Sequence, residues 1–267
     1  MRIGVLGPVH VEDADGRPCT PPALKLRIVL AALLVRYNRV VSTQCLIDEL
    51  WGGEPTKTAR TAIQVYVSGL RKLFQGASLP EDVVTIVTRP PGYIIELDER
   101  EFDLPCFEKA LDKARQAEDE GDLDFAASLI SDGLALWRGP ALYGTCGTSV
   151  LETESRRLNE LRMAACERRI IVDLKRGRDS ELIGELYALI AEYPLRERLW
   201  EFLILALHNQ GRPADALHAY DRIRLMMRDE LGLEPGASLQ ELQQVVLSRS
   251  PVTVAENGPV LYTASGG

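Results

Sequence analysis

The chain has 267 residues, of which 46% are hydrophobic and 26% are charged, and its formal net charge is −8. This length and hydrophobic content predict two globular domains with sizeable cores. The longest apolar stretch, Ile28–Val35, is too short for a bilayer span of ~20 residues, and the N-terminus lacks the apolar run of a secretory signal. We therefore expect a cytoplasmic protein without a membrane segment.

The cysteines are odd in number, widely spaced and without a CxxC pair, which is typical of reduced and mostly buried thiols. They are Cys19, Cys45, Cys106, Cys146 and Cys166. The histidines, His10, His208 and His218, lie outside any metal-ligand or catalytic motif such as HExxH or GxSxG. We expect no disulfide, no metal, no cofactor and no enzymatic activity.

The negative charge is unevenly distributed. Residues 1–97 carry 11 Lys and Arg against 9 Asp and Glu, whereas residues 98–267 carry 20 against 30. Within the first part, Lys57–Gln75 contains four cationic residues and no acidic residue. A nucleic-acid phosphate would respond to this local patch more than to the overall charge.

The N-terminal third begins with strands and continues with helices. Loose alternation of apolar residues over 3–11, followed by the turn Asp13–Gly16, predicts short strands and a hairpin. After Thr20-Pro21-Pro22, which would place proline in the first turn of a helix, apolar residues recur at helical spacing over 26–37. Ser42 is suited to cap a second, short helix that ends at Gly52-Gly53.

A third helix and a hairpin follow. Residues 58–74 predict an amphipathic helix with one apolar and one polar face. The β-branched segment Val83–Thr88 and the segment Tyr93–Leu97 predict a hairpin whose tip is Arg89-Pro90-Pro91-Gly92. Three helices before such a hairpin predict an α+β winged helix-turn-helix over residues 1–98. The stretch Gly52–Ala59 exceeds the simple turn of ~3–4 residues, which indicates a loop variant.

After a charged connector, Asp98–Asp103, the composition turns helical and acidic. The candidate helices cover 107–118, 123–137, 151–175, 181–192, 196–209 and 214–231. Glycine and proline breakers between them predict paired antiparallel helices, and hence an all-α domain over residues 104–250. The tail, residues 251–267, has no periodicity, and we expect it to be disordered.

One helix pair matches the packing positions of a tetratricopeptide repeat. The matching positions are Trp200-x2-Leu203, then Gly211, then Ala216-x3-Tyr220. A degenerate second copy begins near Gly121. The all-α domain is therefore predicted to be tetratricopeptide-like, and its grooves would suit a peptide, a small molecule or self-association.

The polar face of the third helix and the hairpin tip are the candidate DNA-binding residues. Gln64 can bond adenine in two places, and Val65 can touch a thymine methyl. Thr61, Gln64, Val65 and Ser68 are expected to approach bases, and Arg60, Arg71 and Lys72 to hold phosphate. The tip arginine, Arg89, is suited to a minor groove. The alternative is an ordinary solvated helix beside an ordinary turn.

The run Ala62–Leu73, together with Thr88–Tyr93, resembles the OmpR-type winged helix of the Streptomyces antibiotic regulatory protein family. Three further segments, Leu134–Leu142, Tyr193–Glu197 and Glu230–Gly236, resemble the bacterial transcriptional activation domain of that family. The resemblance covers residues 1 to about 248. With it, the complete set of expected DNA-binding residues is Lys57, Arg60, Thr61, Gln64, Val65, Ser68, Arg71, Lys72, Thr88, Arg89 and Tyr93.

The resemblance implies an activator of antibiotic or other secondary-metabolite genes. Such an activator binds direct repeats in double-stranded promoter DNA, as a homodimer or a tandem pair, and recruits RNA polymerase through the sigma factor and the alpha subunit. The loop after the second helix would face the polymerase, which makes Asp48, Glu49, Trp51 and Glu54 candidate contacts. Alternatively, Trp51 belongs to the core and these acids face solvent.

A second functional class stays open, namely a protein-interaction scaffold in which the helical repeats bind a peptide and the winged domain is another docking surface. The acidic C-terminal part favours this reading. The acid-free third helix and the basic hairpin tip favour the DNA-binding regulator.

Overall fold

The structure is a computed structural model that describes residues 3–79, 83–145, 149–249, 252–253 and 261–262. The chain forms two compact units: residues 1–114 with 129–165, and residues 115–128 with 166–267. The domain limits expected at residues 98, 104 and 250 stay predictions, because this division follows compactness and falls elsewhere. In the described part of the chain, no helix is both long and apolar enough to cross a membrane.

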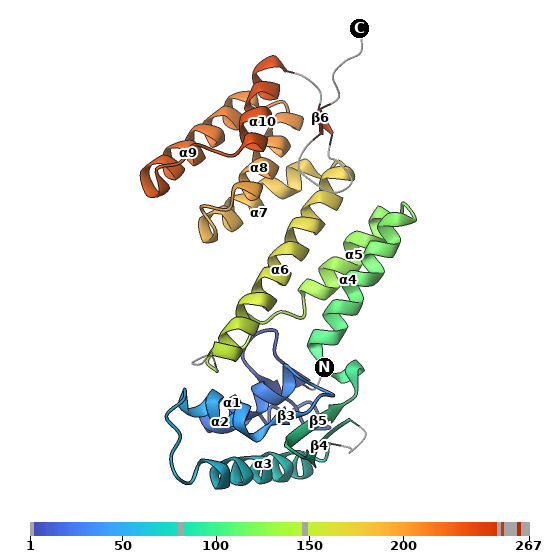
Figure 1. Ribbon diagram of the computed structural model, residues 1–267. Coiled ribbons are helices and arrows are strands. Elements are labelled where there is room, and N and C mark those ends of the chain that lie inside the picture. The colour runs from blue at the N-terminus through green and yellow to red at the C-terminus, as the bar shows by residue number, and fades with distance from the viewer. Residues whose placement is uncertain (1–2, 80–82, 146–148, 250–251, 254–260, 263–267) are drawn as a thin grey trace. The chain divides into compact units, whose positions relative to one another are not determined.

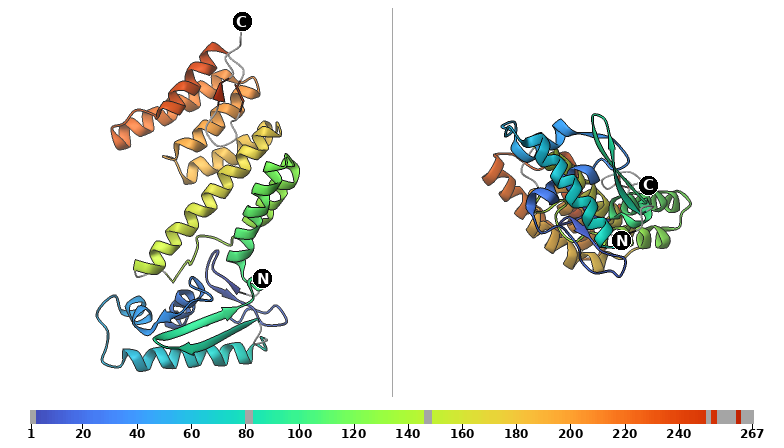
Figure 2. Two further views of the ribbon diagram at one scale, coloured as in Figure 1. Left: turned by 45° about the vertical axis from the view of Figure 1, so that its right-hand side comes forward. Right: turned by 90° about the horizontal axis from the view of Figure 1, so that it is seen from below.

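The first unit contains the predicted winged helix (Figure 1). Its elements are β1 (Ile3–Gly4), β2 (His10–Val11), α1 (Leu24–Leu34), β3 (Val41–Ser42), α2 (Thr43–Trp51), α3 (Ala59–Gly76), β4 (Val84–Arg89) and β5 (Gly92–Leu97). β1 and β2 pair antiparallel, and a second antiparallel sheet has the order β3-β5-β4. Figures 1 and 2 both show α3 beside the β4–β5 hairpin.

Local signals set the ends of two of these helices. Ser42 caps α2 by accepting a hydrogen bond from the backbone N–H of Cys45, and Gly52 ends the helix in the left-handed conformation, both as predicted. The expectation of proline in the first turn of α1 is wrong, because Ala23 is the N-cap and the helix begins at Leu24. The carbonyls of Pro21 and Pro22 instead accept hydrogen bonds from the Arg27 guanidinium.

The hairpin closes over two residues, Pro90 and Pro91, between Arg89 and its cross-strand partner Gly92. Gly92 is required there, because an added Cβ would lie 1.9 Å from the carbonyl oxygen of Val41 on β3. The absence of a side chain therefore lets β3 and β5 approach closely at the base of the hairpin tip.

The charged connector, Asp98–Asp103, also contains buried residues. Its 3-10 turn, Glu99–Glu101, is followed by Phe102 and Asp103, both fully buried. The Asp103 carboxylate accepts hydrogen bonds from the N–H groups of Val5 and Leu6, and its ion pair with Arg138 measures 2.9 Å. Burial raises the pKa of Asp103.

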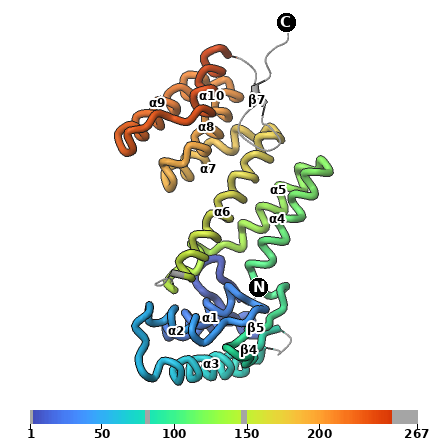
Figure 3. The backbone as a smooth tube through the Cα atoms, in the orientation of Figure 1, coloured from blue at the N-terminus to red at the C-terminus, as the bar shows by residue number. Residues whose placement is uncertain are grey.

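Among the residues that the structure describes, seven α-helices follow the winged helix. They are α4 (Asp103–Asp119), α5 (Leu123–Leu134), α6 (Ser149–Lys175), α7 (Asp179–Glu192), α8 (Glu197–Asn209), α9 (Pro213–Leu231) and α10 (Ala237–Ser248). Figure 3 traces the backbone through the last four. The six predicted helices are confirmed with shifted ends. The seventh, α10, was not predicted, although its buried Leu239, Leu242 and Val246 have helical spacing.

The repeat reading is supported by three connections of the same kind. Gly121, Gly177 and Gly211 follow α4, α6 and α8 with φ between 69° and 82°. In each case the next residue donates its N–H to the carbonyl five positions earlier, which is the closing bond of a Schellman motif. The same glycine-containing turn thus connects the helices of three successive pairs.

The core of the second unit is centred on α8. Trp200, Leu203, Ala216 and Tyr220, the predicted repeat positions, are buried in one apolar cluster drawn from α6, α7, α8, α9 and α10. The indole N–H of Trp200 donates to the carbonyl of Pro194 at 2.9 Å. Burial of this large ring with its polar atom satisfied contributes to the stability of the unit.

Two expectations concern the tail and the thiols. Most of residues 251–267 lies outside the described residues, and within that stretch β6 (Val252–Thr253) pairs with β7 (Leu261–Tyr262). The described cysteines are free and half-buried, whereas mostly buried thiols were expected: Cys19, Cys45, Cys106 and Cys166. Cys146 lies outside the described residues.

Candidate nucleic-acid interface

α3 has one packed face and one bare face. Its buried residues recur every three or four positions and lie toward α1, α2 and β4: Ala59, Ile63, Val67, Leu70 and Phe74. This stripe is the apolar face that the sequence predicted. Because α3 is held along one stripe only, the opposite side of the helix remains accessible.

The expected base-reading side chains gather on that accessible side. Thr61, Gln64, Val65 and Ser68 are all exposed, and Val65 reaches 62%. Together with Gly69 and Lys72 they line one shallow depression of about 370 Å³. The depression combines an amide, two hydroxyls and an exposed isopropyl group. This is the mixture of hydrogen-bonding and apolar contacts that reads base edges in a major groove.

Three cationic side chains surround this face. Lys57, Arg60 and Lys72 are exposed and form no ion pair with any residue that the structure describes. Lys57 precedes α3, Arg60 lies in its first turn and Lys72 borders the depression. Because no carboxylate neutralises them, their charge is available to an external anion.

Arg71 and Thr88 are arranged differently from the other expected contacts. The Arg71 side chain is half-buried, and its Nε donates to the carbonyl oxygen of Ile86 at 2.8 Å. Its Nη2 donates to the hydroxyl of Thr88 at 2.9 Å. These two residues, expected to contact DNA separately, are thus bonded to each other across α3 and β4.

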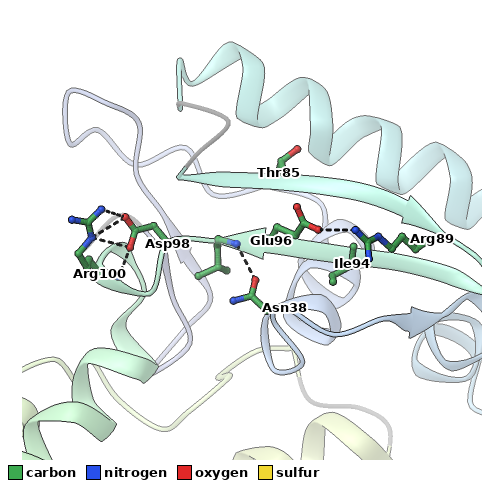
Figure 4. Close-up of a pocket in the computed structure, with 8 residues that line it drawn as sticks. Asn38, Thr85, Arg89, Ile94, Glu96, Asp98 and Arg100 are labelled. Carbon is green, nitrogen blue, oxygen red and sulfur yellow. Dashed lines mark hydrogen bonds and ion pairs between the residues drawn. The ribbon is translucent and has the colours of Figure 1, made fainter.

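The hairpin tip presents Arg89 with a neighbouring acid. The Arg89 side chain is 62% exposed and lies 3.8 Å from the Glu96 carboxylate on β5. Figure 4 shows this pair on the sheet face that also carries Thr85 and Ile94, beside Asn38. An exposed pair at this distance is weak, so the guanidinium can exchange Glu96 for another anion.

The structure corrects one expected DNA contact. Tyr93 is 7% exposed, because it lies on the central strand β5 between Val41 of β3 and Thr88 of β4. Its ring belongs to the core of the hairpin and is not presented to a ligand. Among the other expected contacts, Arg71 is half-buried and the rest are exposed.

The candidate polymerase contacts also differ in their exposure to solvent. Asp48 and Glu54 are exposed, and Asp48 accepts a hydrogen bond from the Gln44 amide at 2.8 Å. Trp51 is half-buried, and the Lys25 ammonium lies 5.2 Å from the centroid of its ring. Glu49 is only 3% exposed, so its place in the expected contact surface is wrong; it lies on the packed face of α2.

No group of three or more His, Cys, Asp or Glu side chains suited to a metal ion occurs among the residues described. The sequence interpretation missed the Arg71–Thr88 bond, for which a spacing of 17 positions gives no periodic signal. It also missed the burial of Asp103, whose partners in the chain lie 97 and 98 positions away.

The winged helix and the helical region match two family models, which together define a class of winged-helix transcriptional regulators with a helical activator domain. Residues 102–247 match the family model described as bacterial transcriptional activator domain, and residues 23–95 match that of the C-terminal part of transcriptional regulatory proteins. The chain is 36% identical to regulatory protein DnrI of Streptomyces peucetius, over 99% of this chain and 98% of the relative.

Two further relatives are longer than this chain. Regulatory protein AfsR of Streptomyces coelicolor is 39% identical over 99% of this chain, which spans 26% of AfsR. The solved structure of Mycobacterium tuberculosis EmbR, in complex with a low-affinity phosphopeptide, is 36% identical with a TM-score of 0.86, over 93% of this chain and 65% of EmbR. The chain belongs to the Streptomyces antibiotic regulatory protein family of transcriptional regulators.

Proposed function

We propose that this regulator is a sequence-specific DNA-binding activator that acts in the cytoplasm and is not an enzyme. One observation carries the proposal: the exposed depression on α3, lined by Thr61, Gln64, Val65 and Ser68 and flanked by cations without an acidic partner among the described residues. α3 would enter the major groove, and Arg89 at the hairpin tip would enter the neighbouring minor groove.

Attraction and selectivity would come from different groups. Lys57, Arg60 and Lys72 would neutralise phosphates, which gives affinity without sequence preference. Gln64 and Val65 would read base edges, since a glutamine amide suits adenine and an isopropyl group suits a thymine methyl. The functional division therefore runs along α3, with charge at its borders and base readout at its centre.

The family resemblance extends the proposal to promoter architecture. Two copies would occupy direct repeats beside a promoter, either as a tandem pair or as a homodimer, and would recruit RNA polymerase through the sigma factor and the alpha subunit. The regulated genes would direct antibiotic or other secondary-metabolite synthesis. Head-to-tail occupancy fits direct repeats, whereas a two-fold dimer would require an inverted repeat.

Selection of bound fragments from a library of Streptomyces genomic DNA tests the DNA-binding proposal. We expect a repeated site whose affinity falls steeply with salt. The double variant Arg60→Gln/Lys72→Gln should weaken binding to all fragments. It should also make the negative slope of log affinity against log salt shallower by about 0.9 for each lost phosphate contact. The matched control, Arg212→Gln, removes a cation already paired with Asp215 and should leave the slope unchanged. Equal binding by all three proteins would contradict the proposal.

A transcription assay tests polymerase contact separately. Asp48 and Glu54 are exposed near the end of α2, so the double variant Asp48→Asn/Glu54→Gln should keep DNA affinity and lose activation. Buried Glu49 is left intact, because its substitution would disturb packing. If transcription persists at the wild-type level with the same promoter occupancy, these residues do not face polymerase.

A further inference from the structure

The bond between α3 and the hairpin has a geometry that a lysine could not reproduce. Arg71 donates through Nε to the Ile86 carbonyl at 2.8 Å and through Nη2 to the Thr88 hydroxyl at 2.9 Å. Two acceptors on alternate residues of one strand are thus held by one rigid, planar guanidinium. The exposed ammonium of neighbouring Lys72 makes no such link within the described chain.

The link is placed where the hairpin has little other support. β4 is an edge strand, hydrogen-bonded to β5 on one side only, so its outer carbonyls lack a strand partner. Arg71 supplies a donor to one of them, at Ile86, and to the side chain of Thr88 immediately before Arg89 at the tip. Arg71 thereby holds the last residues of β4 against α3.

We propose that Arg71 is a positioning residue that sets the placement of the hairpin tip relative to α3, and that Thr88 is its receiving partner. This inference rests on the proposed DNA-binding function, since its consequence is that the helix and the tip are held for simultaneous entry into adjacent grooves. Arg71 would then act through geometry rather than chiefly through attraction to a phosphate. Preorganisation of this kind removes an ordering cost from binding.

Three observations favour this role over a free phosphate contact. Arg71 is half-buried, whereas Arg60 and Lys72 are exposed. Its charge-assisted hydrogen bonds go to strand β4, and such bonds are stronger than neutral ones. Arg71 also lines a small groove between α3 and β4, together with Phe74 and Val84, so part of the residue lies against the fold.

Charge-conserving variants separate positioning from attraction. Arg71→Lys keeps the positive charge but loses the paired donors, and Thr88→Val loses the acceptor without changing charge. Thr88→Ser keeps the hydroxyl and is the matched control for Thr88→Val. Lys72→Gln is the control for loss of a cation on the same helix. Each full-length protein is compared by hydroxyl-radical footprinting on a selected site and by hydrogen exchange without DNA.

We expect Arg71→Lys and Thr88→Val to lose protection of the minor-groove sugars under the tip and about tenfold in affinity, the loss expected for one charge-assisted hydrogen bond. Their salt dependence should match the wild type. Amides of residues 84–89 should exchange faster in the free proteins, while those of α1 keep wild-type rates and show that the fold is intact. Lys72→Gln should show the reverse, with lower salt dependence but an intact footprint.

Wild-type exchange rates and footprints for Arg71→Lys and Thr88→Val would overturn the inference. So would a loss of salt dependence in Arg71→Lys, since the phosphate contact would then be its main role. If the wild type leaves no footprint on any DNA, the proposed function fails, and the exchange of residues 84–89 without DNA still decides whether Arg71 holds the hairpin.

Discussion

α3 and α8 both bury apolar residues, but their surroundings differ. α8 buries nine of its 13 residues, including the unbroken run Leu199–Leu207, because α7, α9 and α10 all pack on it. α3 buries five of its 18 residues along one stripe. A helix enclosed on most sides can contribute mainly to stability, whereas a helix held on one side keeps a face for recognition.

The charges on the two helices differ in the same way. Arg198 of α8 lies 3.4 Å from the Glu167 carboxylate and over the ring of Phe202. Arg60 and Lys72 of α3 have no ion pair in the described part of the chain. Arg198 therefore contributes to the fold, while the cations of α3 leave a positive potential that an external polyanion can use.

The largest effect should come from α8. Replacing fully buried Trp200 removes its ring from the core and its hydrogen bond to Pro194. Trp200→Ala should therefore lower the free energy of unfolding of the second unit by roughly 3–5 kcal/mol. Denaturant unfolding followed by circular dichroism measures the loss. Leu225→Ala, at a position 48% exposed on α9, should stay close to wild type; an equal loss there would remove the distinction between enclosed and exposed positions.

A smaller effect of a different kind is expected from α3. Gln64 is exposed and lines the depression, so Gln64→Ala should leave the unfolding free energy nearly unchanged. It should instead reduce discrimination at one base pair by about 1–3 kcal/mol. Binding titrations on single-base variants of the selected site measure this change. Gln75→Ala, exposed near the end of the same helix and outside the depression, is the control and should keep the wild-type preference.

The features that could be predicted from the sequence are those that depend on neighbouring residues in the chain. The two faces of α3 were predictable because a helix repeats every 3.6 residues and the buried and exposed positions follow that period. Gly52, Gly121 and Gly211 marked helix ends because left-handed backbone favours glycine. Such local signals sufficed for the winged helix, the helix pairs and the shared depression.

Contacts between distant segments were not predictable in this way. Arg71 looked like a phosphate ligand because periodicity places it beside exposed residues, and nothing in its neighbourhood reveals that Thr88 would face it. Glu49 was expected to face the polymerase because of the family resemblance, yet it is 3% exposed on α2. The missed helix α10 is a different case, since its apolar spacing was present but the last predicted helix ended at residue 231.

The smallest effect concerns Glu201, an acidic residue within the buried run of α8. Burial, together with the carboxylates of Glu197 and Glu167, raises its pKa above the ordinary value of 4.5, against the opposing influence of Arg198. Protonated Glu201 avoids the larger desolvation cost of the charged carboxylate, so its contribution to stability is most favourable below pH 4.5. That contribution is lost as pH rises through the higher pKa of the folded state.

Glu201→Gln should therefore raise the unfolding free energy slightly at neutral pH and remove this part of the pH dependence. The exposed control Glu241→Gln on α10 should do neither. Denaturant unfolding at several pH values between 4.5 and neutrality measures both. Destabilisation by Glu201→Gln at neutral pH would mean that the carboxylate of Glu201 is a favourable partner of Arg198, and that α8 uses this charge for the fold as it uses Arg198.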